Sequence, residues 1–227
     1  MALPLVTPSP EPDDVQAQLG GMGTRLEFLH DVLRAGEAAR RTAVPNDPTG
    51  TAGRRAYEAH VRTIRELHIE REGWARLVHG RLELVCNADR SVAMGVMVGD
   101  AATGQASLFP KNARRRGPAT DMVTRANAGE GAPHVQTALF VAGAGPDGVA
   151  LSDEEAFALK TWFLLSYRTQ IGETVRIDCE LSQPKRFEDG FVVEWGPRIP
   201  LPALVMDGIE PTNDDGPGEI DIPVDFR

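Results

Sequence analysis

The sequence predicts an α+β fold in which an antiparallel or mixed sheet packs against two or three helices. Two stretches in the N-terminal third repeat apolar residues every three or four positions, which is typical of amphipathic helices. Residues 175–195 alternate apolar and polar side chains on both sides of a turn, which is typical of an antiparallel hairpin with one buried face. A length of 227 residues suits one compact core.

The predicted single domain occupies residues 21–206, and both ends of the chain are expected to be flexible. Residues 1–20 are proline-rich and carry acidic but no basic side chains. Residues 207–227 form an acidic tail in which Arg227 is the only basic residue. Such segments bury too little apolar surface to offset the entropy of ordering. The net charge of −9 therefore lies mainly in the ends, and it does not exclude an anionic partner for the domain.

Two helices are predicted in the N-terminal third of the chain. The first spans residues 22–41, where apolar positions recur on one face. Proline and glycine residues then interrupt the pattern, and a second helix is predicted for residues 57–78. The apolar residues between 82 and 85 either extend this second helix or begin a strand, and we favour the strand.

The middle of the chain predicts strands. Residues 91–98 and 106–109 are expected to pair as a hairpin, because turn-forming residues separate two short apolar runs. Residues 135–142 are predicted to form a buried strand.

A buried helix is predicted after these strands. Ser152 and Glu155 have the spacing of a capping box, and the apolar run that follows has almost no polar face. We therefore expect a largely buried helix from Ser152 to a stop at Gly172. The hairpin of residues 175–195 follows, with its turn near residues 188–190.

The cysteine content indicates a reducing environment. Cys86 and Cys179 are the only cysteines, no CxxC pair is present, and the first residues lack the basic and apolar regions of a secretory signal. No stretch approaches the roughly 18 to 20 apolar residues that span a bilayer. We therefore expect a cytoplasmic protein with no membrane partner.

One dense basic run contrasts with the acidic balance. Residues 111–117 read Lys-Asn-Ala-Arg-Arg-Arg-Gly, and the prolines and glycine around them predict a loop. Arginine side chains match the oxygens of phosphate groups, and a second basic pair precedes Phe187, which offers a face for stacking. The predicted nucleic-acid contacts are Lys111, Arg114, Arg115, Arg116, Lys185 and Arg186. The alternative is a solvated loop, or a loop paired with the acidic tail.

Asp178 and Glu180 suggest a metal site. They lie two residues apart on a predicted strand, a spacing that can hold a divalent metal for phosphodiester hydrolysis, with Lys185 as an electrostatic aid. The simpler interpretation is the polar face of a half-exposed strand.

A zinc site is disfavoured. If the second helix continued to Cys86, it would align His68, Glu72, His79 and Cys86 on one stripe. Gaps of seven residues, and a glycine at position 80, argue against that arrangement. These histidines are better interpreted as surface residues.

Two further segments match the residue pattern of a known motif but not the structural context that the motif requires. Gly143 to Gly148 follow the glycine pattern of dinucleotide-binding loops, but the acidic start of the next predicted helix would repel phosphate. Ser182 and Lys185 have the SxxK spacing but lie in a predicted turn, which excludes the serine hydrolase arrangement.

No set of residues converges on a reaction, and no cofactor is expected. We therefore predict a non-catalytic binding or accessory subunit that contacts nucleic-acid phosphates through the basic run. A metal-dependent nuclease or phosphodiesterase using Asp178 and Glu180 is one alternative. The other is an interaction adaptor in a protein complex that acts through its acidic tail.

Overall fold

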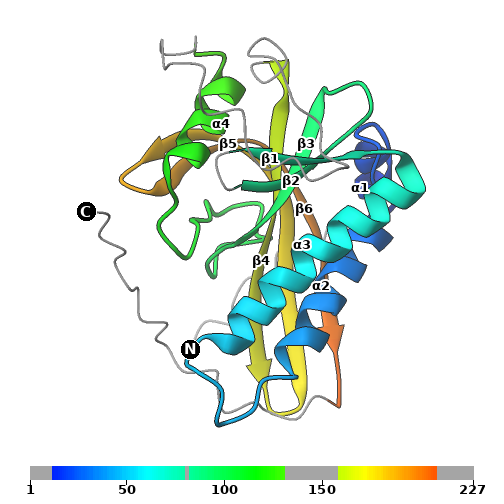
Figure 1. Ribbon diagram of the computed structural model, residues 1–227, viewed down its shortest axis with the longest axis vertical. Helices are drawn as coiled ribbons and strands as arrows, with labels where there is room; N and C mark the ends of the chain where they lie inside the picture. Colours follow the sequence, from blue (N-terminus) through cyan, green and yellow to red (C-terminus); the bar gives the residue numbers. More distant parts are fainter. Residues whose placement is uncertain (1–11, 80–81, 131–157, 209–227) are drawn as a thin grey trace.

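The computed structural model describes residues 12–79, 82–130 and 158–208, and the strands in these ranges form one six-stranded sheet (Figure 1). The strands follow one another across the sheet in chain order. Neighbouring strands are antiparallel, except that β3 and β4 run parallel. The strands are β1 Ala75–His79, β2 Leu82–Cys86, β3 Val92–Val98, β4 Lys160–Ile171, β5 Thr174–Glu188 and β6 Phe191–Met206.

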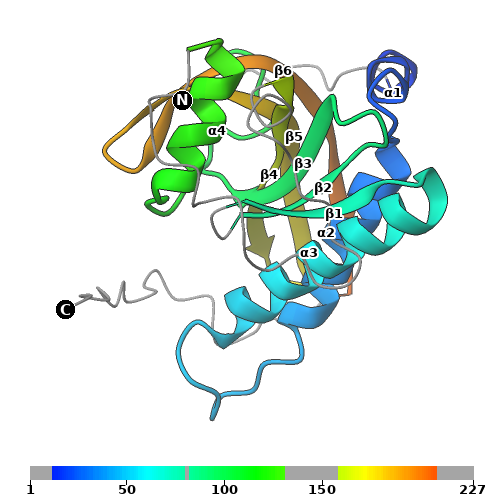
Figure 2. The ribbon, with the colours of Figure 1, turned by 45° about the horizontal axis from the view of Figure 1, so that its top comes forward.

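Helices cover both faces of the sheet. Within the described ranges they are α1 Pro12–Gly20, α2 Leu26–Arg40, α3 Thr51–Glu72 and α4 Pro118–Ala128. Leu29 of α2 and Ile64 of α3 share one apolar cluster with Leu181 of β5. Val123 of α4 belongs to a second cluster with Trp195 of β6. Figure 2 shows the sheet between α4 on one side and α2 and α3 on the other. The predicted α+β fold with a mixed sheet is confirmed.

The helix predicted from Ser152 to Gly172 is wrong over its described C-terminal part. Residues 160–171 form strand β4, and the predicted cap at residues 152–155 lies outside the described ranges. β4 pairs with a strand on each side, and its residues Leu164 and Phe163 enter different apolar clusters. A strand buried on both faces has a continuous apolar run. Such a run lacks the alternation that distinguishes a strand from a buried helix.

The hairpin predicted for residues 91–98 and 106–109 is wrong. β3 forms as predicted, but its neighbours are β2 and β4, and residues 106–109 lie in turns and loop. The strand predicted at residues 135–142 lies outside the described ranges. The short apolar run at 106–109 is therefore not part of the sheet, and two of its side chains, Leu108 and Phe109, are exposed.

The second predicted helix begins and ends six residues earlier than expected, at Thr51–Glu72 instead of residues 57–78. α3 ends at Glu72, because Gly73 adopts a left-handed φ of 68° that terminates it. Val78, which we placed in the helix, lies in β1. The strand favoured for residues 82–85 is confirmed as β2, and the hairpin of residues 175–195 is confirmed as the β5–β6 pair.

Residues 12–20 differ from the flexible segment that we expected, because they form α1. Val15 and Leu19 are buried in the same cluster as α2 and α3. Their spacing of four places both side chains on one helix face. Prolines earlier in the segment masked this short amphipathic signal. Within the described ranges, no helix combines the length and apolar character needed to cross a membrane.

Candidate anion-binding site

Residues 111–117, here called the basic loop, lie between β3 and α4 and have no helical or strand structure. The prediction of a loop is therefore confirmed. Lys111, Arg114 and Arg115 are exposed, whereas Arg116 is only partly exposed. The loop thus presents three of the six predicted cations on the surface.

Asn112 fixes this loop against the β5–β6 hairpin. Its side chain is buried, its Nδ2 donates to the carbonyl oxygen of Gly190 at 3.0 Å, and its Oδ1 accepts from the amide of Val192 at 2.7 Å. The amide of Arg116 also donates to Gly190, at 2.8 Å. The amide of Ala113 donates to the carbonyl of Val98, at the end of β3, at 2.9 Å. The backbone of the loop is therefore held by two elements of the sheet.

The hairpin cations are paired with carboxylates. Lys185 Nζ lies 2.6 Å from Glu194, and Arg186 lies 3.0 Å from Glu188. Both basic side chains remain more than half exposed, but the neighbouring carboxylates offset their charge toward an anionic ligand. Phe187 packs partly against the core, which limits the stacking face that the sequence suggested.

A cavity of about 570 Å³ lies beneath the basic loop. Its walls come from the C-terminal half of α2, the first turns of α3, strands β3, β4 and β5, and the loop. Five arginines and one carboxylate are among the described residues that line it: Arg40, Arg54, Arg114, Arg116, Arg168 and Glu37. We call this cavity the arginine pocket. These groups give its lining a formal excess of four positive charges.

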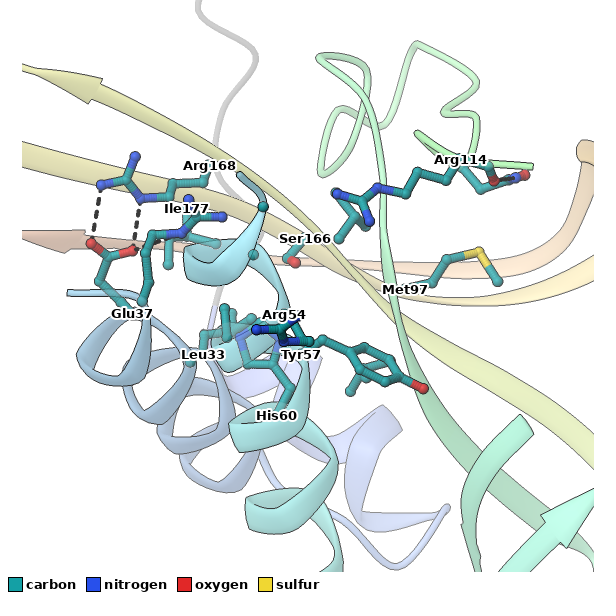
Figure 3. A pocket seen from close by; sticks show the side chains of 18 of the residues that line it. Leu33, Glu37, Arg54, Tyr57, His60, Met97, Arg114, Ser166, Arg168 and Ile177 are labelled. Carbon is teal, nitrogen blue, oxygen red and sulfur yellow. Dashed lines mark hydrogen bonds and ion pairs between the residues drawn. The ribbon is translucent and has the colours of Figure 1, made fainter. Parts of the chain in front are cut away.

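Glu37 is already engaged by one of these arginines. Arg168 Nε and Nη2 lie 2.7 and 3.0 Å from the two carboxylate oxygens of Glu37, which is buried (Figure 3). Arg40 lies at 4.0 Å from the same carboxylate. This bidentate ion pair joins β4 to α2 in the lining of the pocket. It offsets the negative charge of Glu37, which would otherwise repel an anion.

The guanidinium of Arg116 lies in an environment that is unfavourable for a charged group. Its Nε is buried and has no hydrogen-bond partner among the described residues. Burial lowers the pKa of the Arg116 guanidinium, and the nearby charge of Arg114 lowers it further. Burial also raises the pKa of the phenol of Tyr57, another residue of the lining. A buried donor without an acceptor destabilises the site, and an anionic acceptor would relieve that cost.

His60 adds no positive charge to the pocket at neutral pH. Burial lowers its pKa to about 4, and the charge of Arg40 acts in the same direction. The imidazole packs directly against the backbone of α2, because a Cβ on Gly36 would lie 1.8 Å from its Nε2. His60 is therefore a packing residue between α2 and α3.

The N-terminus of α3 adds partial positive charge to the same pocket. Thr49, Gly50 and Gly53 line the cavity, the cap residue Gly50 provides no side-chain hydrogen bond, and the first turn carries no acidic residue. The amide end of a helix favours anions. The sequence prediction found Arg114 and Arg116 but missed Arg40, Arg54 and Arg168, which come from three distant elements. The acid-free first turn of α3 was the one local signal.

The predicted metal pair has a different role. Glu180 is fully buried, whereas we expected it on an exposed polar face. Its carboxylate accepts two hydrogen bonds from Arg198 and one each from Ser182 and the amide of Gly104. Asp178 pairs with Arg176 on the same strand. Among the described residues, no group of three or more histidine, cysteine, aspartate or glutamate side chains is placed to hold a metal.

The remaining predicted motifs are not brought together either. His68 is buried and bonds to Thr24 and to the carbonyl of Ile64, so it is not a surface residue. α3 ends at Glu72, which separates His68 from Cys86 on β2. Ser182 and Lys185 lie within β5, not in a turn. The glycine-rich segment 143–148 and residues 209–227 of the acidic tail lie outside the described ranges.

Comparison of the chain with protein-family models, curated proteins and solved structures finds no match.

Proposed function

We propose that this protein is a non-catalytic binding subunit that contacts nucleic-acid phosphates through the basic loop. The supporting observation is the anchoring of that loop by Asn112 to Gly190 and Val192. A loop held by the sheet keeps the backbone of Lys111, Arg114 and Arg115 in place, so less backbone entropy is lost when these residues bind. The acidic net charge of the chain does not oppose this role, because it is concentrated in the ends.

Backbone contacts of this kind have a characteristic signature. Lysine and arginine side chains that neutralise phosphates release condensed counterions, so affinity falls steeply with salt and depends little on base sequence. We assign the main contribution to the loop cations. We assign a smaller one to Lys185 and Arg186, because their neighbouring carboxylates must be displaced or shared.

Fluorescence-anisotropy titrations of labelled single- and double-stranded oligonucleotides at low salt test this proposal. The Lys111→Ala/Arg115→Ala variant is expected to bind about tenfold more weakly than the unmodified chain. The Arg62→Ala/Arg71→Ala variant removes the same charge from exposed positions on α3 and is the matched control. It should retain its affinity. Equal affinities for the unmodified chain and the loop variant would refute the role of the loop.

The acidic tail requires a separate arm of this experiment. The sequence also allows an alternative function, in which residues 207–227 cover the basic loop or bind a basic protein. A chain that ends at residue 208 should bind oligonucleotides more tightly if the tail competes for the loop. Unchanged binding would exclude the idea that the tail covers the basic loop. The tail would then be used to search for protein partners.

A further inference from the structure

The arginine pocket has the features of a site for a small, doubly charged group. Its volume of about 570 Å³ falls within the roughly 300–1,000 Å³ of small-molecule sites. Helices α2 and α3, three strands and the basic loop surround it, whereas Lys111 and Arg115 lie on the exposed surface of the loop and are not in the lining. Lys111 and Arg115 on the loop surface and the arginines of the pocket therefore suit different ligands, and Arg114 lies between the two.

The described lining of the pocket carries more arginines than carboxylates. Arg168 and Glu37 satisfy one another, and His60 is neutral at pH 7. Arg54 and Arg116 add two further guanidinium groups to the described lining, beside Arg40 and Arg114, which have interactions of their own. Figure 3 shows Arg54 and Arg114 entering from α3 and from the basic loop. A phosphate monoester carries about −1.5 to −2 charges at pH 7 and three strong acceptor oxygens, which matches this arrangement better than a singly charged diester.

Two further observations specify where such a group would lie. The Nε of Arg116 is a buried donor without an acceptor among the described residues. The uncapped start of α3, with Gly50 and Gly53 in the lining, allows an anion to approach the backbone amides closely. Tyr57 adds an aromatic face and a phenol at the same wall.

We infer that the arginine pocket binds a phosphomonoester group, carried either by a small phosphorylated molecule or by the end of a nucleic-acid strand. Arg54 and Arg116 donate to its oxygens, and the amide end of α3 faces the same charge. This inference goes beyond the proposed contact with internal phosphates, because that contact needs only the exposed face of the loop.

Calorimetric titration with AMP, adenosine and inorganic phosphate, at constant ionic strength, tests the pocket. AMP and phosphate should bind and adenosine should not. Arg54→Gln should weaken AMP binding about tenfold or more, as expected for a lost charge-assisted hydrogen bond. Ser166→Leu should do the same by filling the cavity from β4 without changing its charge. Arg125→Gln removes an exposed arginine from α4, outside the lining, and should leave AMP binding unchanged.

Oligonucleotides that differ only in a 5′-phosphate or 5′-hydroxyl distinguish the two sources. Tighter binding of the phosphorylated strand, lost in Ser166→Leu, assigns the pocket to strand ends, and equal binding assigns it to small molecules. If neither AMP nor phosphate binds, or if binding survives both pocket variants, the inference is overturned. Binding of the hydroxyl-ended strand without binding of AMP would overturn the pocket site alone. Binding of AMP without binding of the hydroxyl-ended strand would overturn the proposed function alone. Arg54 is exposed, so its variant remains informative if Ser166→Leu fails to fold.

Discussion

Arg198 of β6 and Glu180 of β5 form a bidentate ion pair, with Nε–Oε1 and Nη2–Oε2 distances of 2.9 and 2.6 Å. Glu180 is completely buried. The same guanidinium donates to the carbonyl oxygens of Gln105 and Leu108. The pair therefore joins the sheet to the segment that precedes the basic loop. This structural role is different from the metal ligation that the spacing of Asp178 and Glu180 suggested.

Arg198→Met should lower the free energy of unfolding by about 3–5 kcal/mol, because it leaves the carboxylate of Glu180 buried without its partner. Arg176→Met is the matched control on the neighbouring strand. It breaks the more exposed pair with Asp178 and should cost about 0–1 kcal/mol. Urea denaturation measures both. Similar losses for the two variants would contradict the structural importance of the buried pair.

Asn112→Ala should release the basic loop from the hairpin. We expect a loss of about 1–3 kcal/mol of stability, because buried backbone groups lose their partner, together with weaker oligonucleotide binding. Asn127 is the matched control, since its side chain bridges α4 to the backbone of Thr161 and Pro184. Asn127→Ala should destabilise the protein similarly but leave oligonucleotide affinity unchanged. If both variants lose affinity equally, loop anchoring is not the cause.

Gly36→Ala should be destabilising although alanine favours helices. The added Cβ would lie 1.8 Å from Nε2 of His60, and overpacking of this kind costs about 1–3 kcal/mol. A Cβ at Gly20, the last residue of α1, meets nothing within 4 Å, so Gly20→Ala is the control. The double variant Gly36→Ala/His60→Ala should be more stable than the sum of its single changes predicts. Strict additivity in thermal or urea unfolding would contradict the close contact.

Stability should fall as the pH is lowered from about 6.5 toward 4. Burial lowers the pKa of His60 to about 4 in the folded state, whereas an unfolded histidine has a pKa near 6.5. The unfolded chain therefore takes up a proton first, so the contribution of His60 is complete above pH 6.5 and is lost down to pH 4. His30 and His68, whose pKa values are also lowered by burial, act in the same direction.

His60→Asn should reduce this pH dependence. Between pH 6 and 5 the slope of unfolding free energy against pH should decrease by up to about 1.4 kcal/mol per pH unit. Urea titrations at several pH values measure the two slopes. Identical slopes for the variant and the unmodified chain would mean that His60 titrates normally in the folded state.

The sequence predicted most clearly the elements that have one buried face. The β5–β6 hairpin and α2 alternate with the periods of a half-buried strand and helix, so their patterns were sufficient. β4 is buried on both faces, so its apolar residues from Trp162 to Leu165 are continuous. Without alternation of apolar and polar residues, the sequence does not distinguish a strand from a helix here. The pairing of β3 with β4, rather than with residues 106–109, depends on contacts between distant segments.

The same distinction applies to the candidate site. Lys111 to Arg116 are adjacent, so their charge is visible in the sequence. Arg40, Arg54 and Arg168 meet them only through the packing of α2, α3 and β4 around one cavity. Asn112 gave no signal, because its role depends on the backbone of Gly190 and Val192, about eighty residues away.

The salt dependence of single-stranded oligonucleotide binding tests the central claim most directly. The unmodified chain should show log Kd rising linearly with log salt, with a slope of about 0.7 for each phosphate contact. Lys111→Ala/Arg115→Ala removes two contacts and should reduce that slope by about 1.4. Absence of binding at low salt, or an unchanged slope in the variant, would contradict the assignment of phosphate contacts to the basic loop.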